Sequence, residues 1–235
     1  DRWRNDNLTN RYQGVQFGYT SAGRYTSWND IWSYPGYKER DILPGDYKYE
    51  DWNGDGEING QDEHPFAFDQ TPWLQFSLNA GLQWKNLDFN MLLQGSALGS
   101  MEYKEPLHEI WGKNGGGALT QFLDRWHPVD PKADPYDPST VWTSGHYAYT
   151  GRWAKNNSAF NRVSTAYLRL KSIELGYTFP KLKQIPNASL RIYANAYNLL
   201  TFTGVKFVDP EHPDDDLGRM YPLNKTYTLG VSLSF

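Results

Sequence analysis

The chain has 235 residues, of which 39% are hydrophobic, 21% charged and 16% aromatic, with no cysteine and a formal net charge of -4. The aromatic content excludes an intrinsically disordered chain, and the negative charge argues against a nucleic-acid-binding protein, which needs a basic surplus to neutralise phosphates. The absence of cysteine excludes a disulfide framework and a thiolate metal site.

Residues 1–72 form the first predicted region and show little periodic patterning. Val15, Phe17 and Tyr19 make at most one short strand. We therefore expect mostly irregular loop structure here, with one sharp motif at residues 51–62.

That motif fits the twelve-residue calcium loop. Gly56 stands at its sixth position, where the chain of such a loop turns sharply. The expected oxygen ligands are Asp51, Asn53, Asp55, the backbone carbonyl of Glu57, and Asp62. Position 12 is Asp62, as in dockerin loops, where an EF-hand has Glu. The spacing predicts a structural Ca²⁺ site that pins a long loop; the alternative is an Asp/Asn/Gly-rich turn that binds no ion.

Five later segments alternate apolar and polar residues with period two, the pattern of a β-strand with two different faces. They cover residues 74–84, 87–97, 166–179, 190–197 and 227–235. In the third segment the apolar phase shifts, as a β-bulge near Lys171 would produce. We expect one face to carry Leu74, Phe76, Leu78, Leu82, Leu87, Phe89, Met91, Leu93, Leu190 and Ile192. The other should carry Gln75, Asn79, Gln83, Asn90, Gln94, Arg191 and Asn195.

The lengths of these segments favour a transmembrane barrel over a soluble β-sandwich. Soluble strands cluster near ~5 to 6 residues, whereas eleven residues tilted by ~40° project to roughly 28 Å, about the height of the apolar band of a barrel. Lys85-Asn86 is a two-residue turn, whereas the connections 98–165 and 201–224 are long and polar. Outer-membrane barrels have this alternation of short periplasmic turns and long outer loops.

Five strands are too few to close a barrel, which needs about eight. We therefore expect residues 73–235 to be the C-terminal strands of a larger transmembrane antiparallel β-barrel, in an all-β fold with long extracellular loops. Residues 1–72 would be an extracellular loop region, and the edge strands would pair with the rest of the barrel.

A catalytic role has little support. The five histidines lie outside the alternating segments, and the chain has no HExxH motif and no nucleophile elbow. Carboxylate pairs such as Asp130 and Asp134 would in principle suit a glycosidase, but Asp-rich loop surface explains them more simply. We expect no enzyme.

Several short motifs follow one another along the chain. They are Pro44-Gly45-Asp46 before the calcium-type loop, Tyr167-Leu168-Arg169-Leu170-Lys171, Leu175-Gly176-Tyr177-Thr178, Asn198-Leu199-Leu200-Thr201, Asp209-Pro210-Glu211 and the closing Thr226–Phe235. In this order they resemble the C-terminal half of SusC/RagA-type TonB-dependent outer-membrane transporters.

The resemblance implies a fragment of a 22-stranded barrel with an N-terminal plug, in the bacterial outer membrane and in contact with its lipid. It also implies uptake of glycans or peptides with a SusD-like surface lipoprotein, powered by TonB through the plug, which has no counterpart in this chain. The alternative is a soluble, calcium-stabilised carbohydrate-binding or dockerin-bearing β module.

Overall fold

The computed structural model describes residues 11–37, 41–104, 107, 118–149, 158–180, 188–211 and 220–235. The chain divides into two compact units, and each is assembled from three separate stretches of sequence. The first unit comprises residues 1–70, 100–163 and 212–220, and the second comprises residues 71–99, 164–211 and 221–235. None of the helices in the described residues is long and apolar enough to cross a membrane.

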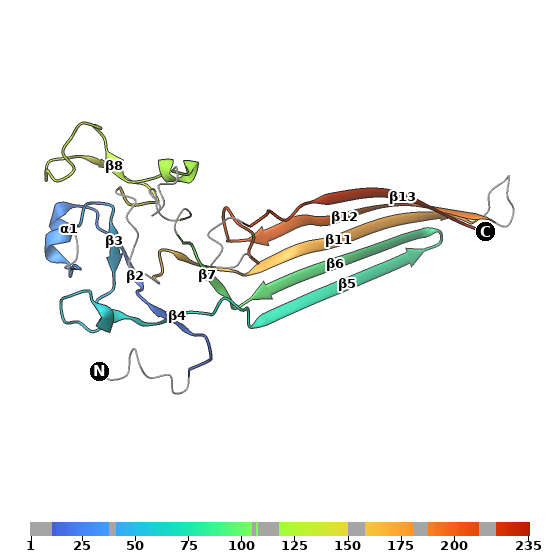
Figure 1. Ribbon diagram of the computed structural model, residues 1–235, viewed down its shortest axis with the longest axis horizontal. Coiled ribbons are helices and arrows are strands. Elements are labelled where there is room, and N and C mark those ends of the chain that lie inside the picture. The colour runs from blue at the N-terminus through green and yellow to red at the C-terminus, as the bar shows by residue number, and fades with distance from the viewer. Residues whose placement is uncertain are drawn as a thin grey trace. The chain divides into compact units, whose positions relative to one another are not determined.

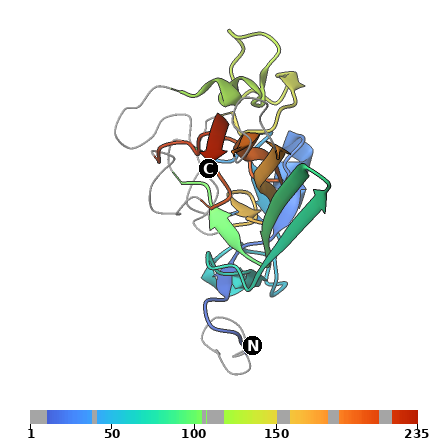
Figure 2. The same ribbon diagram turned by 90° about the vertical axis from the view of Figure 1, so that its right-hand side faces the viewer.

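The second unit is a five-stranded antiparallel sheet, shown as the long ribbon in Figure 1. Its strands are β5 (Leu74–Trp84), β6 (Leu87–Ala97), β11 (Tyr167–Phe179), β12 (Ser189–Thr203) and β13 (Thr226–Ser234), in the order β13-β12-β11-β6-β5. The five predicted strands are thus confirmed. The C-terminus lies at the end of the sheet where the β5–β6 turn lies, and Figure 2 turns this end toward the viewer.

The register of the five strands gives the sheet two faces, one mostly apolar and the other mostly polar. Because side chains alternate along a strand and directly paired residues share a face, the pairs Leu78–Leu93 and Phe89–Leu175 belong to one face. We call it the apolar face. It carries all ten residues that the sequence analysis assigned to one side, and the seven polar residues assigned to the other side lie on the opposite, polar face.

A β-bulge in β11 keeps the two faces separate along the longest strands. The register between β11 and both of its neighbours shifts between Leu170 and Ser172, as the phase change in the sequence predicted. Across the bulge, Asn198 of β12 has a left-handed backbone with φ 53°. β12 then continues to Thr203, three residues into the range predicted as loop, because its last residues still pair with the beginning of β11.

The first unit is built from short elements. They are β1 (Gln16–Gly18), β2 (Ser21–Arg24), α1 (Trp28–Ser33), β3 (Tyr47–Tyr49), η1 (Gly60–Asp62), β4 (His64–Ala67), β7 (Ser100–Glu102), η3 (Thr120–Leu123), β8 (His127–Pro128), β9 (Trp142–Thr143) and β10 (Arg162–Ser164). The strands pair as β1–β4, β2–β3, β7–β10 and β8–β9. The expectation of at most one strand before residue 73 is wrong, because strands of three or four residues are too short to show a period-two pattern.

Tyrosines form the core of this unit. The buried cluster is Tyr19, Tyr25, Tyr37, Tyr47, Tyr49, Ile58 and Ala148. The buried hydroxyls are satisfied by backbone carbonyls: Tyr25 donates to Pro35 at 2.8 Å and Tyr37 donates to Tyr47 at 3.2 Å. Burial raises the pKa of Tyr25 above its ordinary value.

One ion pair lies beside the tyrosine core. Lys48 Nζ lies 2.6 Å from Asp30 Oδ1 and 3.9 Å from the centroid of the Tyr34 ring. The hydrogen bond from Lys48 is the main cause that holds the pKa of Asp30 below its ordinary value. The pair therefore contributes stability above the ordinary carboxyl pKa and loses it as the pH falls through the lowered value.

Candidate functional site

The predicted calcium loop is organised by hydrogen bonds from its own backbone. Asp51 at position 1 accepts from the amides of Gly54 at 2.7 Å and Gly56 at 2.8 Å. Asp62 at position 12 accepts from the amide of Asn59 at 2.8 Å. Gly56 has φ 86°, as the sharp turn at position 6 requires. The first and last predicted ligands are thus held toward the same loop backbone.

Position 8 of the loop ties it to the tyrosine core. Ile58 is buried within that core, and its amide donates to the carbonyl of Gly36 at 3.3 Å. Gly36 also forms an isolated bridge with Glu57. The conformation of the calcium-type loop is therefore coupled to the packing of the first unit.

In the structure, the side chains of the predicted ligands are not gathered around a common metal position. Within residues 11–37, 41–104 and the other described ranges, no three carboxylate or imidazole groups are gathered closely enough to hold a metal ion. Asn53 instead donates from Nδ2 to Asp55 Oδ2 at 2.6 Å. The donor types and the turn fit Ca²⁺, but binding requires the side chains of Asp51, Asp55 and Asp62 to converge, so the site stays a prediction.

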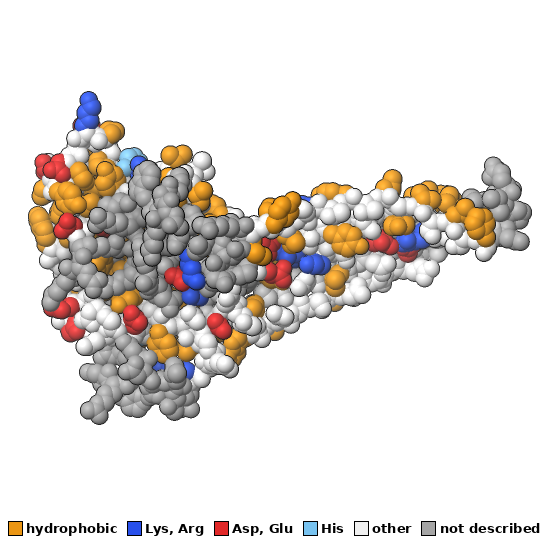
Figure 3. Space-filling model, in the orientation of Figure 1, with side chains coloured by type: hydrophobic (Ala, Val, Ile, Leu, Met, Phe, Trp, Pro, Cys, Tyr) orange, Lys and Arg blue, Asp and Glu red, His pale blue; other side chains and the backbone are white. Residues whose placement is uncertain are grey.

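The polar face of the sheet holds two charged clusters, and Figure 3 shows acidic and basic side chains together on the sheet face turned toward the viewer. In the first cluster, Arg191 of β12 reaches across two strands. Its Nη2 lies 2.6 Å from Glu174 Oε1 on β11, and it also forms a bidentate pair with Asp88 on β6. One guanidinium thus ties three strands together through charge-assisted hydrogen bonds.

A glycine makes room for this ion pair. Gly176 of β11 lies beneath it, and a Cβ at this position would overlap the Arg191 guanidinium and the Asp88 carboxylate. A side chain at residue 176 would therefore displace the pair. Glycine is needed at this position of the motif Leu175-Gly176-Tyr177 because a side chain would overlap the ion pair, not because the backbone has an unusual angle.

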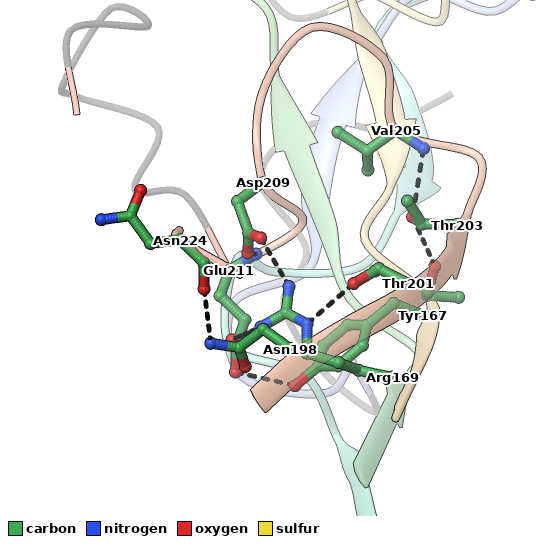
Figure 4. Close-up of polar contacts among 10 residues, drawn as sticks. Tyr167, Arg169, Asn198, Thr201, Thr203, Val205, Asp209, Glu211 and Asn224 are labelled. Carbon is green, nitrogen blue, oxygen red and sulfur yellow. Dashed lines mark hydrogen bonds and ion pairs between the residues drawn. The ribbon is translucent and has the colours of Figure 1, made fainter. Parts of the chain in front are cut away.

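The second cluster, the Arg169 cluster, lies where β11 and β12 pair near their other end (Figure 4). Arg169 is completely buried and donates to Asp209 Oδ2 at 2.5 Å, Glu211 Oε2 at 2.6 Å and Thr201 Oγ1 at 3.0 Å. The Tyr167 hydroxyl donates to the remaining Glu211 oxygen at 2.7 Å. Arg169 is buried while its two carboxylate partners are partly exposed, and these charge-assisted hydrogen bonds hold the segment after β12 against the strand.

The same segment is also held where it leaves the strand. Thr203 Oγ1 donates to the carbonyl of Ala166 at 2.9 Å and accepts from the amide of Val205 at 3.2 Å (Figure 4). Residues 204–211, which we call the anchored loop, are therefore attached to the polar face at both ends. Asp209 and Glu211 fold back onto the strand that contains Arg169.

Only part of this polar face could be predicted from the sequence. Arg191 lies on the predicted face, but its pairing with Asp88 and Glu174 and the contacts of the Arg169 cluster were not predicted. The signal that was available is a charged residue inside a predicted membrane strand, because such a residue usually has a partner and a function. The partners of Arg191 lie 17 and 103 residues away along the chain and leave no local pattern.

Comparisons with known proteins agree with this sheet. No family model matches the chain. TonB-dependent receptor P3 of Formosa agariphila is 28% identical over 211 residues, covering 83% of this chain and 19% of the relative. TonB-dependent receptor P26 of the same organism is 27% identical over 239 residues, covering 95% of this chain and 22% of the relative. The chain thus spans about a fifth of the length of the curated relatives it matches.

Two solved structures share the fold of this chain. The RagAB peptide transporter matches with a TM-score of 0.63 and 20% identity, covering 94% of this chain and 23% of that chain. The RagAB peptide importer in its open-open state matches with a TM-score of 0.59 and 18% identity, covering 93% of this chain and 22% of that chain. The chain is thus similar to TonB-dependent receptors of the bacterial outer membrane, and its two-faced sheet has the fold of a segment of the RagAB transporter barrel.

Proposed function

We propose that this chain forms part of the wall and outer loops of a TonB-dependent importer that takes up glycans or peptides together with a SusD-like surface lipoprotein. The observation that supports this most directly is the separation of faces across five strands of 9 to 15 residues. The apolar face suits lipid and the polar face suits a lumen that holds a plug and passing solutes. The role proposed is transport rather than catalysis.

The soluble alternative explains the apolar face less well. Leu78, Leu82 and Leu229 are each more than half exposed within their strands. A soluble domain rarely exposes a continuous apolar surface of this kind. A carbohydrate-binding or dockerin-bearing module would have to cover it, whereas lipid covers it directly.

Loss of the full-length protein tests the proposal. We expect a deletion strain to lose uptake of, and growth on, either an oligosaccharide mixture or a casein peptide mixture, and to regain it with the intact gene but not in a strain that lacks TonB. Protein purified from the outer membrane should carry a lipoprotein partner with it. Unchanged uptake of both mixtures in the deletion strain would contradict the importer.

We further propose that the loop at residues 51–62 binds Ca²⁺ through Asp51, Asn53, Asp55, the Glu57 carbonyl and Asp62. Its role would be structural, since Ile58 links the loop to the tyrosine core. Terbium replaces calcium in such loops, and the neighbouring Trp52 would sensitise its emission. In the full-length protein, Asp51→Ala should weaken terbium binding about tenfold or more, because it removes one of the charged oxygen ligands.

The matched control is Asp130→Ala, which alters a different Asp-rich turn in the same unit, where Asp130 accepts from the amide of Lys132 at 2.9 Å. It should leave the emission unchanged, and added Ca²⁺ should quench the wild-type signal. Sensitised emission that is equal in wild type and Asp51→Ala would rule out this loop as the site.

A further inference from the structure

The anchored loop contains a strained aromatic residue. Phe207 has a left-handed backbone with φ 71°, a conformation that bulky L-residues rarely adopt. Its side chain is 56% exposed, so a large part of the ring lies at the surface. Strained residues of this kind gather at ligand-binding sites, where the surrounding structure holds them in place.

The structure shows what holds Phe207. Two residues before it, the amide of Val205 donates to Thr203, and Val205 itself is buried. Two residues after it, Asp209 accepts from both Arg169 and the amide of Glu211, the latter at 3.0 Å. Phe207 is thus fixed by short spans on both sides rather than carried on a long free loop.

The position of these anchors determines where the residue lies. Arg169 and Thr201 pair on the polar face, beside Gln94 of β6. If the polar face lines the lumen, as the proposed function requires, the anchored loop lies at the lumen wall near the long-loop end of the strands. An exposed residue in this loop is therefore close to the path of solutes that enter from that side.

We propose that Phe207 is a substrate-contact residue and that Arg169, Asp209 and Glu211 are positioning residues that hold it in its strained conformation. The expected ligand presents a flat apolar surface that packs on a phenyl ring. Two solutes supply that chemistry, the C–H face of a sugar ring and an apolar side chain of a peptide. This inference rests on the proposed import function and assigns part of its binding site.

Photo-crosslinking with solute mixtures tests the contact directly. In cells that express the full-length protein with p-benzoyl-phenylalanine in place of Phe207, illumination during uptake of the oligosaccharide or casein peptide mixture should attach solute to the protein. Carbohydrate staining and mass spectrometry of digested protein distinguish the two sources. The control places the same probe at Phe202, which is exposed on the apolar face and should capture no solute. A Phe207 probe that captures nothing, or captures only the lipoprotein, would overturn the proposal.

A double-mutant cycle separates positioning from general stability. Phe207→Ala should raise the solute concentration for half-maximal uptake about tenfold, the loss expected for one buried ring contact. Glu211→Gln should raise it as well, but should add nothing in the Phe207→Ala background, because the ring it positions is gone. Additive effects, or wild-type uptake by Phe207→Ala at equal outer-membrane levels, would contradict the assignment. Lack of uptake by wild type would instead refute the proposed import function.

Discussion

Substituting alanine for Gly45 is expected to destabilise the first unit by about 2 to 5 kcal/mol. Gly45 follows Pro44 in a tight turn closed by the amide of Asp46, which donates to the carbonyl of Leu43 at 3.0 Å. Its φ of 91° is left-handed, which costs an L-residue about 1 to 2 kcal/mol. A Cβ would also overlap the ring of Trp126, and relieving that overlap costs about 1 to 3 kcal/mol more.

A second glycine of the same unit separates the cost of the backbone strain from the cost of the overlap with Trp126. Gly23 has φ 99° and no neighbouring atom where its Cβ would lie, so Gly23→Ala should cost only the backbone strain. Limited proteolysis of the full-length protein in detergent measures both, because cleavage in the loops of this unit reports its opening. We expect Gly45→Ala to be cleaved many times faster than Gly23→Ala. Equal cleavage rates would show that Trp126 does not pack against Gly45.

Arginine in the middle of the apolar face is the second change with a large expected effect. Leu78 lies on β5 opposite Leu93, and Leu78→Arg should lower the free energy of unfolding in a bilayer by about 2 to 4 kcal/mol. The physical reason is the cost of placing a guanidinium in hydrocarbon. Urea titration of the full-length protein refolded into phospholipid vesicles, followed by tryptophan fluorescence, measures the change.

The neighbouring residue supplies the matched control. Asn79 lies on the polar face opposite Leu92, one position along the same strand. Asn79→Arg should therefore change the unfolding free energy by less than about 1 kcal/mol, because its side chain stays out of the lipid. If both variants lose equal stability, the apolar face does not face lipid.

The sequence by itself determined the strands and their faces. Leu74–Trp84 and Leu87–Ala97 have the predicted bounds in the structure, and the phase change near Lys171 marks the bulge correctly. These features are local, since each depends on the alternation of neighbouring side chains about one strand axis. The ligand spacing of residues 51–62 is local in the same way, which is why the sequence could predict a calcium-type loop.

Only the tertiary structure decided which distant residues meet. Arg169 is joined to Asp209 and Glu211, about 40 residues along the chain, and Arg191 is joined to Asp88, 103 residues away. The same holds for the first unit, where residues 100–163 join residues 1–70. The strand order, the register and the path of the anchored loop depend on which distant residues bury each polar group and form hydrogen bonds with it. These pairings form only when the whole chain folds, so they cannot be predicted from one segment of the sequence.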